Sequence, residues 1–362
     1  MLRYLTAGES HGKCLTAILE GMPAGLKIDE AKINNELARR QKGYGRGGRM
    51  AIEKDTADIL SGLRNGETIG SPIAVLIKNN DFLIDELPEL LNVRPGHADL
   101  AGILKYKRQD ARDILERSSA RETAVRVAVG AIVKQFLAEI GIQIISHVVS
   151  IGNVQIDSNV TFEQALESEK SEVRCVDKEA EQEMINAIDS AKELGSSLGG
   201  IFEVIVHGHP VGLGSYVQWD RKLNAKLAYA IMGIQAIKGI EIGSAFENSG
   251  KYGHETHDEI VYDEQTGYSH KTNNAGGIEG GMSNGEDIIV RGAMKPIPTL
   301  TNGLNTVNIK TKETVKASAE RSDVCAVPAA CVVAEAVVAI EIANAFLEKF
   351  GGDSIEEIKS RI

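Results

Sequence analysis

The chain has 362 residues, of which 43% are hydrophobic, and a formal net charge of −11 from 40 basic and 51 acidic side chains. This length allows a large buried core and two or three domains. The acidic balance argues against a general nucleic-acid or acidic-membrane surface, and four cysteines without C-x-x-C spacing indicate neither zinc nor a disulfide framework. Since the first residues lack the apolar core of a signal peptide, we expect a cytoplasmic, reduced protein.

Short apolar runs that end in glycine or proline turns predict strands at 15–20, 142–151, 201–207 and 287–290. Helices are predicted at 124–140, closed by Gly141, and at 223–238. The apolar segment 324–346 contains a proline and two glutamates, which fits a buried helix better than a membrane span. The polar stretch 248–270 is expected to be an irregular surface loop. Apolar residues surround most of 124–140, which predicts helices sandwiched between sheets.

Two segments of the chain resemble each other. Without a gap, 8–26 (GESHGKCLTAILEGMPAGL) and 195–213 (GSSLGGIFEVIVHGHPVGL) agree at 8 of 19 positions, where typical usage gives about one or two. Further matches follow in the same order, at 32–38 with 222–228 and at 117–119 with 321–323. We therefore predict a single domain of two pseudo-repeats, about 1–190 and 191–362. Coincidence between glycine and proline turns is the alternative.

Residues 117–126 (RSSARETAVR) place three arginines and three hydroxyls where a helix is predicted to begin. Ser119 and Glu122 have the spacing of a capping box. A helix N-terminus offers free N–H groups and a partial positive charge, so arginines beside it predict a bound phosphate or carboxylate. A well-capped core helix with solvated arginines is the alternative.

Two histidines and one aspartate are candidates for proton transfer. His11 lies between glycines before a predicted strand, and the corresponding position of the second repeat is Leu198, which favours a functional role for the histidine. His97 lies in a proline-containing turn. Asp323 stands at the second helix start, where it serves either as a cap or as a base.

The glycine-rich basic segment 39–49 (RRQKGYGRGGR) fits either an RNA-binding protein or a mobile clamp over a small polyanion, and the acidic net charge favours the clamp. Segment 274–285 lacks the G-x-G-x-x-G spacing, which makes a nicotinamide-dependent dehydrogenase the weaker alternative. A backbone bed under a flat ring system, or a flexible connector, fits that segment. His254 and His257 have metal-ligand spacing in a polar loop without nearby cysteine, and we predict no metal site.

Seven ordered blocks resemble the chorismate synthase family: GESHG at 8–12, GRGGRM at 45–50, RPGHAD at 94–99, RSSARETAVR at 117–126, NAGGIEGG at 274–281, KPIPT at 295–299 and RSDVC at 321–325. The resemblance covers nearly the whole chain and is weakest at 248–270. It implies a lyase of the shikimate pathway, in aromatic amino-acid biosynthesis. Such an enzyme removes phosphate and a ring proton from 5-enolpyruvylshikimate 3-phosphate by anti-1,4-elimination, giving chorismate.

The resemblance also implies a cofactor, an assembly and a fold. Reduced FMN (FMNH2) is required without net redox change, and the enzyme is expected to be a homotetramer. With the pattern above, the resemblance predicts an α/β fold of the α+β type: an internally duplicated β-α-β sandwich with central helices between two antiparallel sheets. NADPH is a candidate reductant, but an external flavin reductant is favoured because no reductase domain is visible. Neither nucleic acid nor membrane is an expected partner.

By the same resemblance, His11 protonates the departing phosphate, His97 protonates the reduced flavin or stabilises its charge, and Asp323 acts as a base near flavin N5. The positions that match FMN-binding residues are Arg117, Ser118, Ser119, Gln235, Ala236, Gly280, Lys295, Pro296, Ile297, Pro298, Thr299 and Arg321. Candidates for binding NADP or the polyanionic substrate are Arg40, Arg46, Arg49 and Arg121.

Overall fold

The structure is a computed structural model that describes residues 1–48, 52–156, 159–320 and 322–362. A first antiparallel sheet has the strand order β1-β2-β6-β3. Its strands are β1 (Arg3–Ala7), β2 (Cys14–Glu20), β6 (Ile73–Lys78) and β3 (Ala57–Ile59). Leu15, Ala17 and Leu19 on β2 are buried while Ile18 between them is exposed. This alternation is typical of an antiparallel sheet with one covered face.

A second antiparallel sheet has the order β10-β15-β9-β7-β8. Its strands are β10 (Ile237–Ile242), β15 (Ile288–Met294), β9 (Gly200–His207), β7 (Gln143–Ile151) and β8 (Val154–Gln155). Eight of the nine residues of β7 are buried. This strand lacks alternation because helices pack against it: α11 (Val327–Phe350), α6 (Phe162–Leu166) and α7 (Lys178–Glu193).

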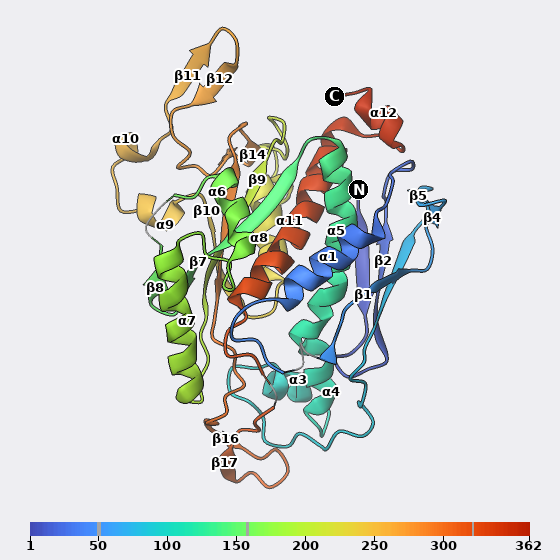
Figure 1. Cartoon of the computed structure of the whole chain (residues 1–362), viewed down its shortest axis with the longest axis vertical. Coiled ribbons are helices and arrows are strands. Elements are labelled where there is room, and N and C mark those ends of the chain that lie inside the picture. The colour runs from blue at the N-terminus through green and yellow to red at the C-terminus, as the bar shows by residue number, and fades with distance from the viewer. Residues whose placement is uncertain (49–51, 157–158, 321) are drawn as a thin grey trace.

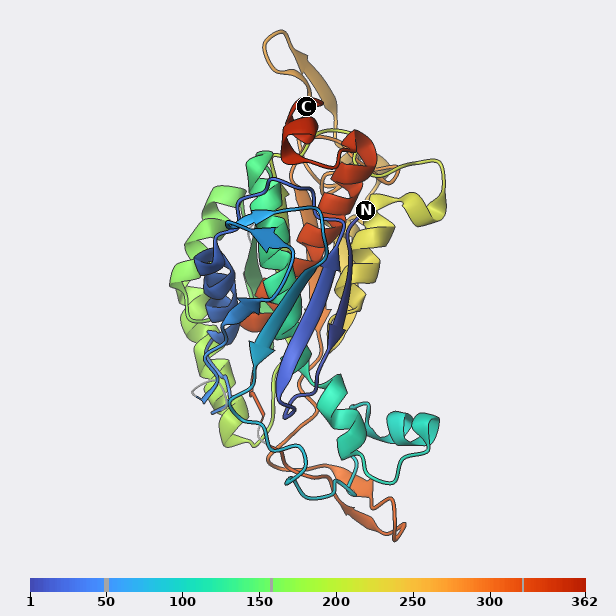
Figure 2. The same cartoon turned by 90° about the vertical axis from the view of Figure 1, so that its right-hand side faces the viewer.

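Two long helices lie between the sheets (Figure 1, Figure 2). Helix α5 (Thr123–Glu139) contacts β2 and β6, α11 contacts β7 and β9, and the two helices pack closely on each other. Gly130 permits this approach, since a Cβ there would lie 2.3 Å from the Cβ of Ala336. Helix α1 (Glu30–Gln41) packs on α5 and α11, and α8 (Leu223–Met232) packs on α11.

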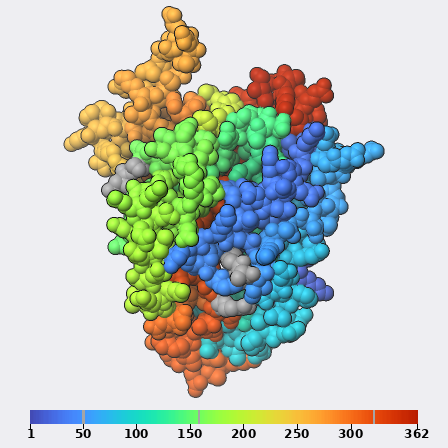
Figure 3. All heavy atoms as spheres, viewed as in Figure 1, coloured from blue at the N-terminus to red at the C-terminus, as the bar shows by residue number. Residues whose placement is uncertain are grey.

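Smaller elements occupy the two ends of the molecule. At one end, α3 (Asp99–Tyr106) and α4 (Arg112–Ser118) lie near the hairpin formed by β16 (Asn305–Val307) and β17 (Thr314–Lys316) (Figure 2). They enclose a small second core of Leu90, Val93, Ile103, Ala111 and Leu115. At the other end, the hairpin β11–β12 projects from the body (Figure 3). The bounds of the remaining elements are β4 (Leu63–Arg64), β5 (Glu67–Thr68), α9 (Ala245–Asn248), α10 (Gly253–Thr256), β11 (Ile260–Asp263), β12 (Gly267–His270), β13 (Ile278–Glu279), β14 (Met282–Ser283) and α12 (Ile355–Lys359), with 3-10 turns η1 (Ala120–Glu122), η2 (Glu167–Lys170) and η3 (Trp219–Arg221).

The mixed helix and sheet class predicted from the sequence is confirmed, as are the four predicted strands and the helix at 124–140. Gly141 ends that helix at φ 84°, and its N–H and that of Ile142 bond back to Ala138 and Leu137 in a Schellman motif. The apolar segment near the C-terminus forms α11, the one helix in the described ranges long and apolar enough to cross a membrane. Its most apolar window is 94% buried in the protein.

Two predicted elements differ in part from the structure. The helix predicted over 223–238 stops at Met232, because Gly233 closes it with N–H bonds to the last turn, and β10 begins at Ile237. The stretch 248–270 is not irregular throughout, because it contains α10 and the β11–β12 hairpin. Tyr262 and Tyr268 face each other across that hairpin with ring centroids 5.0 Å apart. Such cross-strand aromatic pairs stabilise a hairpin that polar composition alone does not predict.

Candidate functional site

His11 lies in the loop 8–12 that joins β1 to β2, here called the His11 loop. Gly8 adopts φ 108°, and a Cβ there would lie 2.3 Å from the carbonyl oxygen of Cys14, so the tight turn requires glycine. The His11 N–H donates to Glu116 Oε2 at 2.8 Å, and Nδ1 lies 3.0 Å from both carboxylate oxygens. Nε2 has no hydrogen-bond partner among the described residues. Glu116 therefore orients the imidazole and directs its other nitrogen away from the carboxylate.

The carboxylate of Glu116 is itself almost fully buried, with 3% of the residue exposed. Burial alone raises the pKa of this carboxyl, but hydrogen bonds from His11 and the charge of Arg112 lower it below its ordinary value. Glu116 consequently remains an acceptor at neutral pH, and it stays available to the Nδ1–H of His11. An imidazole held in this way is prepared for proton transfer through Nε2.

His97 lies in the turn before α3. Its Nδ1 is 2.5 Å from Asp99 Oδ1, and Arg94 donates to the same carboxylate at 2.9 and 3.0 Å. Asp99 is buried; although burial raises its pKa, the bonds from His97 and Arg94 hold that pKa well below the ordinary value. Arg94 also donates to Thr299 Oγ1 at 2.9 Å, and Lys295 Nζ donates to a backbone carbonyl of the turn at 2.7 Å. The structure thus brings the predicted segments 94–99 and 295–299 together.

Arg117 and Ser118 do not begin the long helix as predicted. They end α4, Ser119 caps the 3-10 turn η1 by accepting from the Arg121 N–H, and α5 starts only at Thr123. The capping box is also wrong, because the Glu122 carboxylate turns to Thr6 Oγ1 at 2.7 Å instead. Because α4, η1 and α5 follow one another directly, residues 117–123 do not form the single helix N-terminus that was predicted to bind a phosphate or carboxylate. Arg117 donates to the His11 loop at the Gly8 carbonyl, 3.0 Å away, and to Thr6.

Gln235 and Ala236 join this group from the second half of the chain. Gln235 Nε2 donates to Glu122 at 3.2 Å, while its buried Oε1 has no hydrogen-bond partner in the described part of the chain. Ala236 has φ 67°, a left-handed conformation that costs a non-glycine residue free energy and is retained most often at functional sites. Its carbonyl accepts from the Lys295 N–H at 3.0 Å. Glu122 also forms an ion pair of 3.9 Å with Arg117, and Lys295 contacts the His97 turn, so these residues connect Arg117 to that turn.

A second group consists of buried arginines around Asp55. Arg121 donates to both Asp55 oxygens at 2.7 Å, and Arg40 Nη1 lies 3.6 Å from the same carboxylate. Arg40 Nη1 and Arg121 Nη2 have no hydrogen-bond partner among the described residues. Burial and the charges of Arg46 and Arg121 lower the pKa of Arg40 to about 9, despite the opposing effect of Asp55. An anionic group is the usual partner for such donors.

Asp323 faces the arginine group and does not cap a helix. Helix α11 begins at Val327 with no side-chain cap, so the alternative of a capping aspartate is wrong. Asp323 Oδ1 instead accepts from the Gly47 N–H at 2.6 Å, and its Oδ2 lies 3.4 Å from Arg46 Nε. A Cβ at Gly47 would lie 2.9 Å from the carbonyl of Ser322, so the glycine permits this docking. The described part of segment 39–49 is therefore anchored on the segment that carries Asp323.

Other predicted residues have more distant or undescribed positions. Gly280 lies in the turn between β13 and β14, where its neighbour is the Tyr216 side chain, and no described contact connects it to the other flavin candidates. Ile297 accepts from Ser197 Oγ at 2.6 Å, which fixes the extended segment 295–299 with its two prolines, Pro296 and Pro298. Arg49 and Arg321 lie outside the described residues.

Sequence reasoning missed Glu116, Asp55 and Asn79. Asn79 is buried and contacts both the His11 loop and Arg121. One signal was available, since a polar Asn-Asn-Asp triplet follows the apolar strand 73–78 directly. Glu116 and Asp55 offer no comparable signal, because their partners lie 105 and 66 residues away in the sequence.

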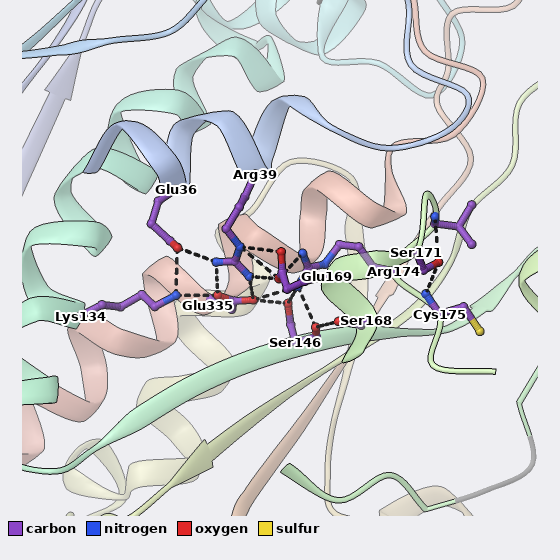
Figure 4. A network of polar contacts seen from close by, with 11 residues as sticks. Glu36, Arg39, Lys134, Ser146, Ser168, Glu169, Ser171, Arg174, Cys175 and Glu335 are labelled. Carbon is purple, nitrogen blue, oxygen red and sulfur yellow. Dashed lines mark hydrogen bonds and ion pairs between the residues drawn. The ribbon is translucent and has the colours of Figure 1, made fainter. Parts of the chain in front are cut away.

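Another polar network joins α1, α5 and α11 (Figure 4). Glu335 on α11 is fully buried and accepts from Arg39 at 2.9 Å, Lys134 at 2.7 Å and Ser146 at 2.5 Å. Arg174 approaches it at 3.3 Å. A cavity of about 370 Å³ lies beside this network and is lined by Arg39, Lys42, Gly43, Tyr44, Glu169, Lys170, Ser171, Glu172 and Arg174. The cations that contact Glu335, which are Arg39, Lys134 and Arg174, are all paired with carboxylates, which indicates a structural network.

Comparisons with known proteins identify the family to which this chain is similar. A family model described as chorismate synthase matches residues 2–347. The chorismate synthase of Syntrophotalea carbinolica is 58% identical over 375 residues, which cover 100% of this chain and 97% of that protein. The chorismate synthase of Geobacter metallireducens is 57% identical and covers 99% and 97%. A crystal structure of chorismate synthase matches with a TM-score of 0.82 at 47% identity, covering 99% of this chain and 96% of that one.

Proposed function

The chain belongs to the chorismate synthase family of carbon–oxygen lyases, and we propose that it converts 5-enolpyruvylshikimate 3-phosphate to chorismate with bound reduced FMN. The proposed reaction is an anti-1,4-elimination of phosphate and a ring proton without net redox change. The observation that supports the proposal is a continuous set of contacts from the loop of one oriented histidine, His11, through Asn79 to the buried arginines Arg121 and Arg40 around Asp55.

The arginine group suits a substrate with one phosphate and two carboxylates. Arg40 and Arg121 each keep one buried guanidinium nitrogen without a hydrogen-bond partner in the described residues. Asp55 and Glu53 lie 3.6 and 3.8 Å from these two nitrogens, which is beyond hydrogen-bond distance. Arginine binds phosphate and carboxylate through two parallel donors, so a polyanion is proposed to accept the hydrogen bonds that these carboxylates do not. Arg46 extends the group toward Asp323 at 3.4 Å. We assign these three arginines to substrate, with NADP as the alternative ligand.

His11 is the proposed general acid for the departing phosphate. Glu116 binds Nδ1 of the imidazole, so Nε2 points away from this carboxylate and is the nitrogen proposed to carry the transferred proton. Protonation of the leaving oxygen avoids the expulsion of a fully charged phosphate, and such general acid catalysis typically contributes about 10²–10⁴-fold. His97 is proposed to stabilise the charge of the reduced flavin, with Asp99 holding the imidazole by its Nδ1. Asp323 is the proposed base.

The residues around Arg117 fit a flavin mononucleotide. Arg117 provides a cation with 42% of its side chain exposed. Gln235 offers a buried amide oxygen without a hydrogen-bond partner in the described ranges, and Ala236 maintains a strained backbone beside Lys295. We propose that these groups, with Ser118, Ser119 and segment 295–299, hold the phosphate and ring of FMN. When bound there, reduced FMN would supply electron density for an elimination without net redox change. A dry, positively charged site favours that chemistry.

An anaerobic assay tests the proposed function. Protein, reduced FMN and 5-enolpyruvylshikimate 3-phosphate are mixed, and phosphate release and the flavin spectrum are followed together. We expect phosphate release without net flavin oxidation, and no release would refute the proposal. His11→Ala should lower turnover by about 10²–10⁴-fold while flavin binding is retained. Unchanged turnover in this variant would exclude the acid role.

The external reductant and the homotetramer stay predictions. Replacing reduced FMN by oxidised FMN and NADPH under the same conditions tests whether the protein reduces its own flavin. Leu5 and Ile18 are 70% and 52% exposed on the open face of the first sheet, which supports burial of that face by another copy. Light scattering of the purified protein measures the number of copies directly.

We also propose that the two halves derive from one duplicated unit arranged as a β-α-β sandwich. The order β1-β2-β6-β3 corresponds to β7-β9-β15-β10, and α1 and α5 correspond to α8 and α11 in the same chain order. Because β7 pairs within the second sheet, the proposed boundary moves from about residue 190 to the turn at Gly141. Superposition of the two halves in an experimental structure tests this proposal.

A further inference from the structure

Asn79 is a buried amide immediately after β6, and it belongs to neither the proposed substrate-binding arginines nor the proposed flavin-binding residues. Its Nδ2 donates to the carbonyls of the His11 loop: to Gly12 at 2.7 Å, to Glu9 at 3.1 Å and to Ser10 at 3.3 Å. Its own N–H donates to the Lys13 carbonyl at 3.1 Å. One side chain therefore donates to three carbonyls of the His11 loop, two before His11 and one after it.

The other end of the same amide contacts the arginine group. Asn79 Oδ1 accepts from Arg121 Nε at 2.9 Å, and Arg121 in turn donates to Asp55 at 2.7 Å. Carbonyls only accept and guanidinium groups only donate, so these partners determine which end is oxygen and which is nitrogen. The loop carbonyls need a donor and Arg121 needs an acceptor. Among the uncharged and acidic side chains of this size, only an amide provides both at opposite sides of one group.

We propose that Asn79 is a positioning residue that fixes the His11 loop relative to the substrate-binding arginines. This inference rests on the proposed function, because Asn79 is proposed to set the distance between the general acid, His11, and the bound anionic substrate. The residue has 5% of its surface exposed, so its side chain acts through the His11 loop and Arg121 and not through solvent or a bound ligand. Misplacement of an acid by about 1 Å can cost about 10²-fold in rate.

The sharpest variant is Asn79→Asp. It preserves size and the acceptor for Arg121, but it replaces the donor with an acceptor that faces the carbonyls of the His11 loop. The matched control is Asn80→Asp, which makes the same change at the exposed neighbouring position. Both variants are combined with His11→Ala in a double-mutant cycle. Thermal melting establishes that each is folded, and Asn79→Ala replaces Asn79→Asp in the cycle if the aspartate variant does not fold.

We expect Asn79→Asp to lower kcat by about 10- to 100-fold, with KM for the substrate changed much less. In the His11→Ala background the same substitution should have little further effect, because the two residues act through one step. Asn80→Asp should retain the wild-type kcat. An equal loss in both backgrounds, or an unchanged kcat, would overturn the proposal.

A second readout is independent of turnover. In NMR spectra, the resonances of the His11 imidazole are identified by their absence in His11→Ala. They should shift in Asn79→Asp and remain unchanged in Asn80→Asp. Resonances that do not shift would refute the positioning role even if kcat fell. A shift in a protein whose wild type releases no phosphate would support the positioning of His11 and refute the proposed function.

Discussion

Replacing Glu335 by glutamine should destabilise the protein without affecting the candidate site directly. Glu335 is fully buried on α11 and contacts three cations, Arg39, Lys134 and Arg174 (Figure 4). Burial alone raises the pKa of this carboxyl, but the cations hold it well below its ordinary value, so it is ionised at neutral pH. Glutamine keeps the shape and removes the charge that these cations face.

The expected loss follows from the cost of leaving buried charges poorly paired. Removing one partner of a buried ion pair typically costs about 3–5 kcal/mol. An unfolding entropy of about 2.1 cal/mol/K per residue, over 362 residues, gives about 0.76 kcal/mol/K. One kcal/mol therefore corresponds to about 1.3 °C, and Glu335→Gln should lower the melting temperature by about 4–7 °C.

The assay is thermal melting by circular dichroism at neutral pH, with Glu341→Gln as the matched control. Glu341 lies on the same helix, and burial raises its pKa, with Lys226 as the opposing charge. Because its ionised form is disfavoured in the folded protein, neutralisation there should leave the melting temperature unchanged or raise it. A melting temperature of Glu335→Gln within about 1 °C of wild type would refute the argument.

Two further predictions concern packing and pH. Gly130→Ala should lower the free energy of unfolding by about 1–3 kcal/mol or more, because its Cβ would lie 2.3 Å from that of Ala336. Urea unfolding measures the loss; Gly250→Ala, with 3.7 Å of clearance, is the control, and equal midpoints would contradict the packing. The pKa of Asp99 is lower in the folded than in the unfolded protein, so its bonds stabilise the fold above the unfolded value of 3.8. That contribution is lost as the pH falls through the folded value. The difference in melting temperature between wild type and Asp99→Asn should therefore be constant above about pH 5 and shrink in acid; a difference independent of pH would contradict this reading.

Local chemistry could be predicted wherever it depended on neighbours in the sequence. Glycines around His11 predicted a tight loop, and Gly141 predicted the end of α5, because a positive φ is a property of the residue itself. Apolar runs predicted β2, β7 and β9, since burial on one or both faces leaves its pattern in the chain. The helix start at Arg117 was predicted wrongly. The Glu122 carboxylate accepts a hydrogen bond from Thr6, which is distant in the sequence, and does not form the predicted capping box with Ser119.

The sequence by itself determined the mixed α/β class, the family, and His11, His97, Asp323 and the arginines as candidates for chemistry. Only the tertiary structure determined which of them meet. His11 is held by Glu116 across 105 residues, and Arg121 pairs with Asp55 across 66. Asp323 belongs with Arg46 and not with the start of α11. The physical reason is that side-chain partners in a buried site are selected by the packing of distant strands and helices, whereas sequence patterns record only burial and local turns.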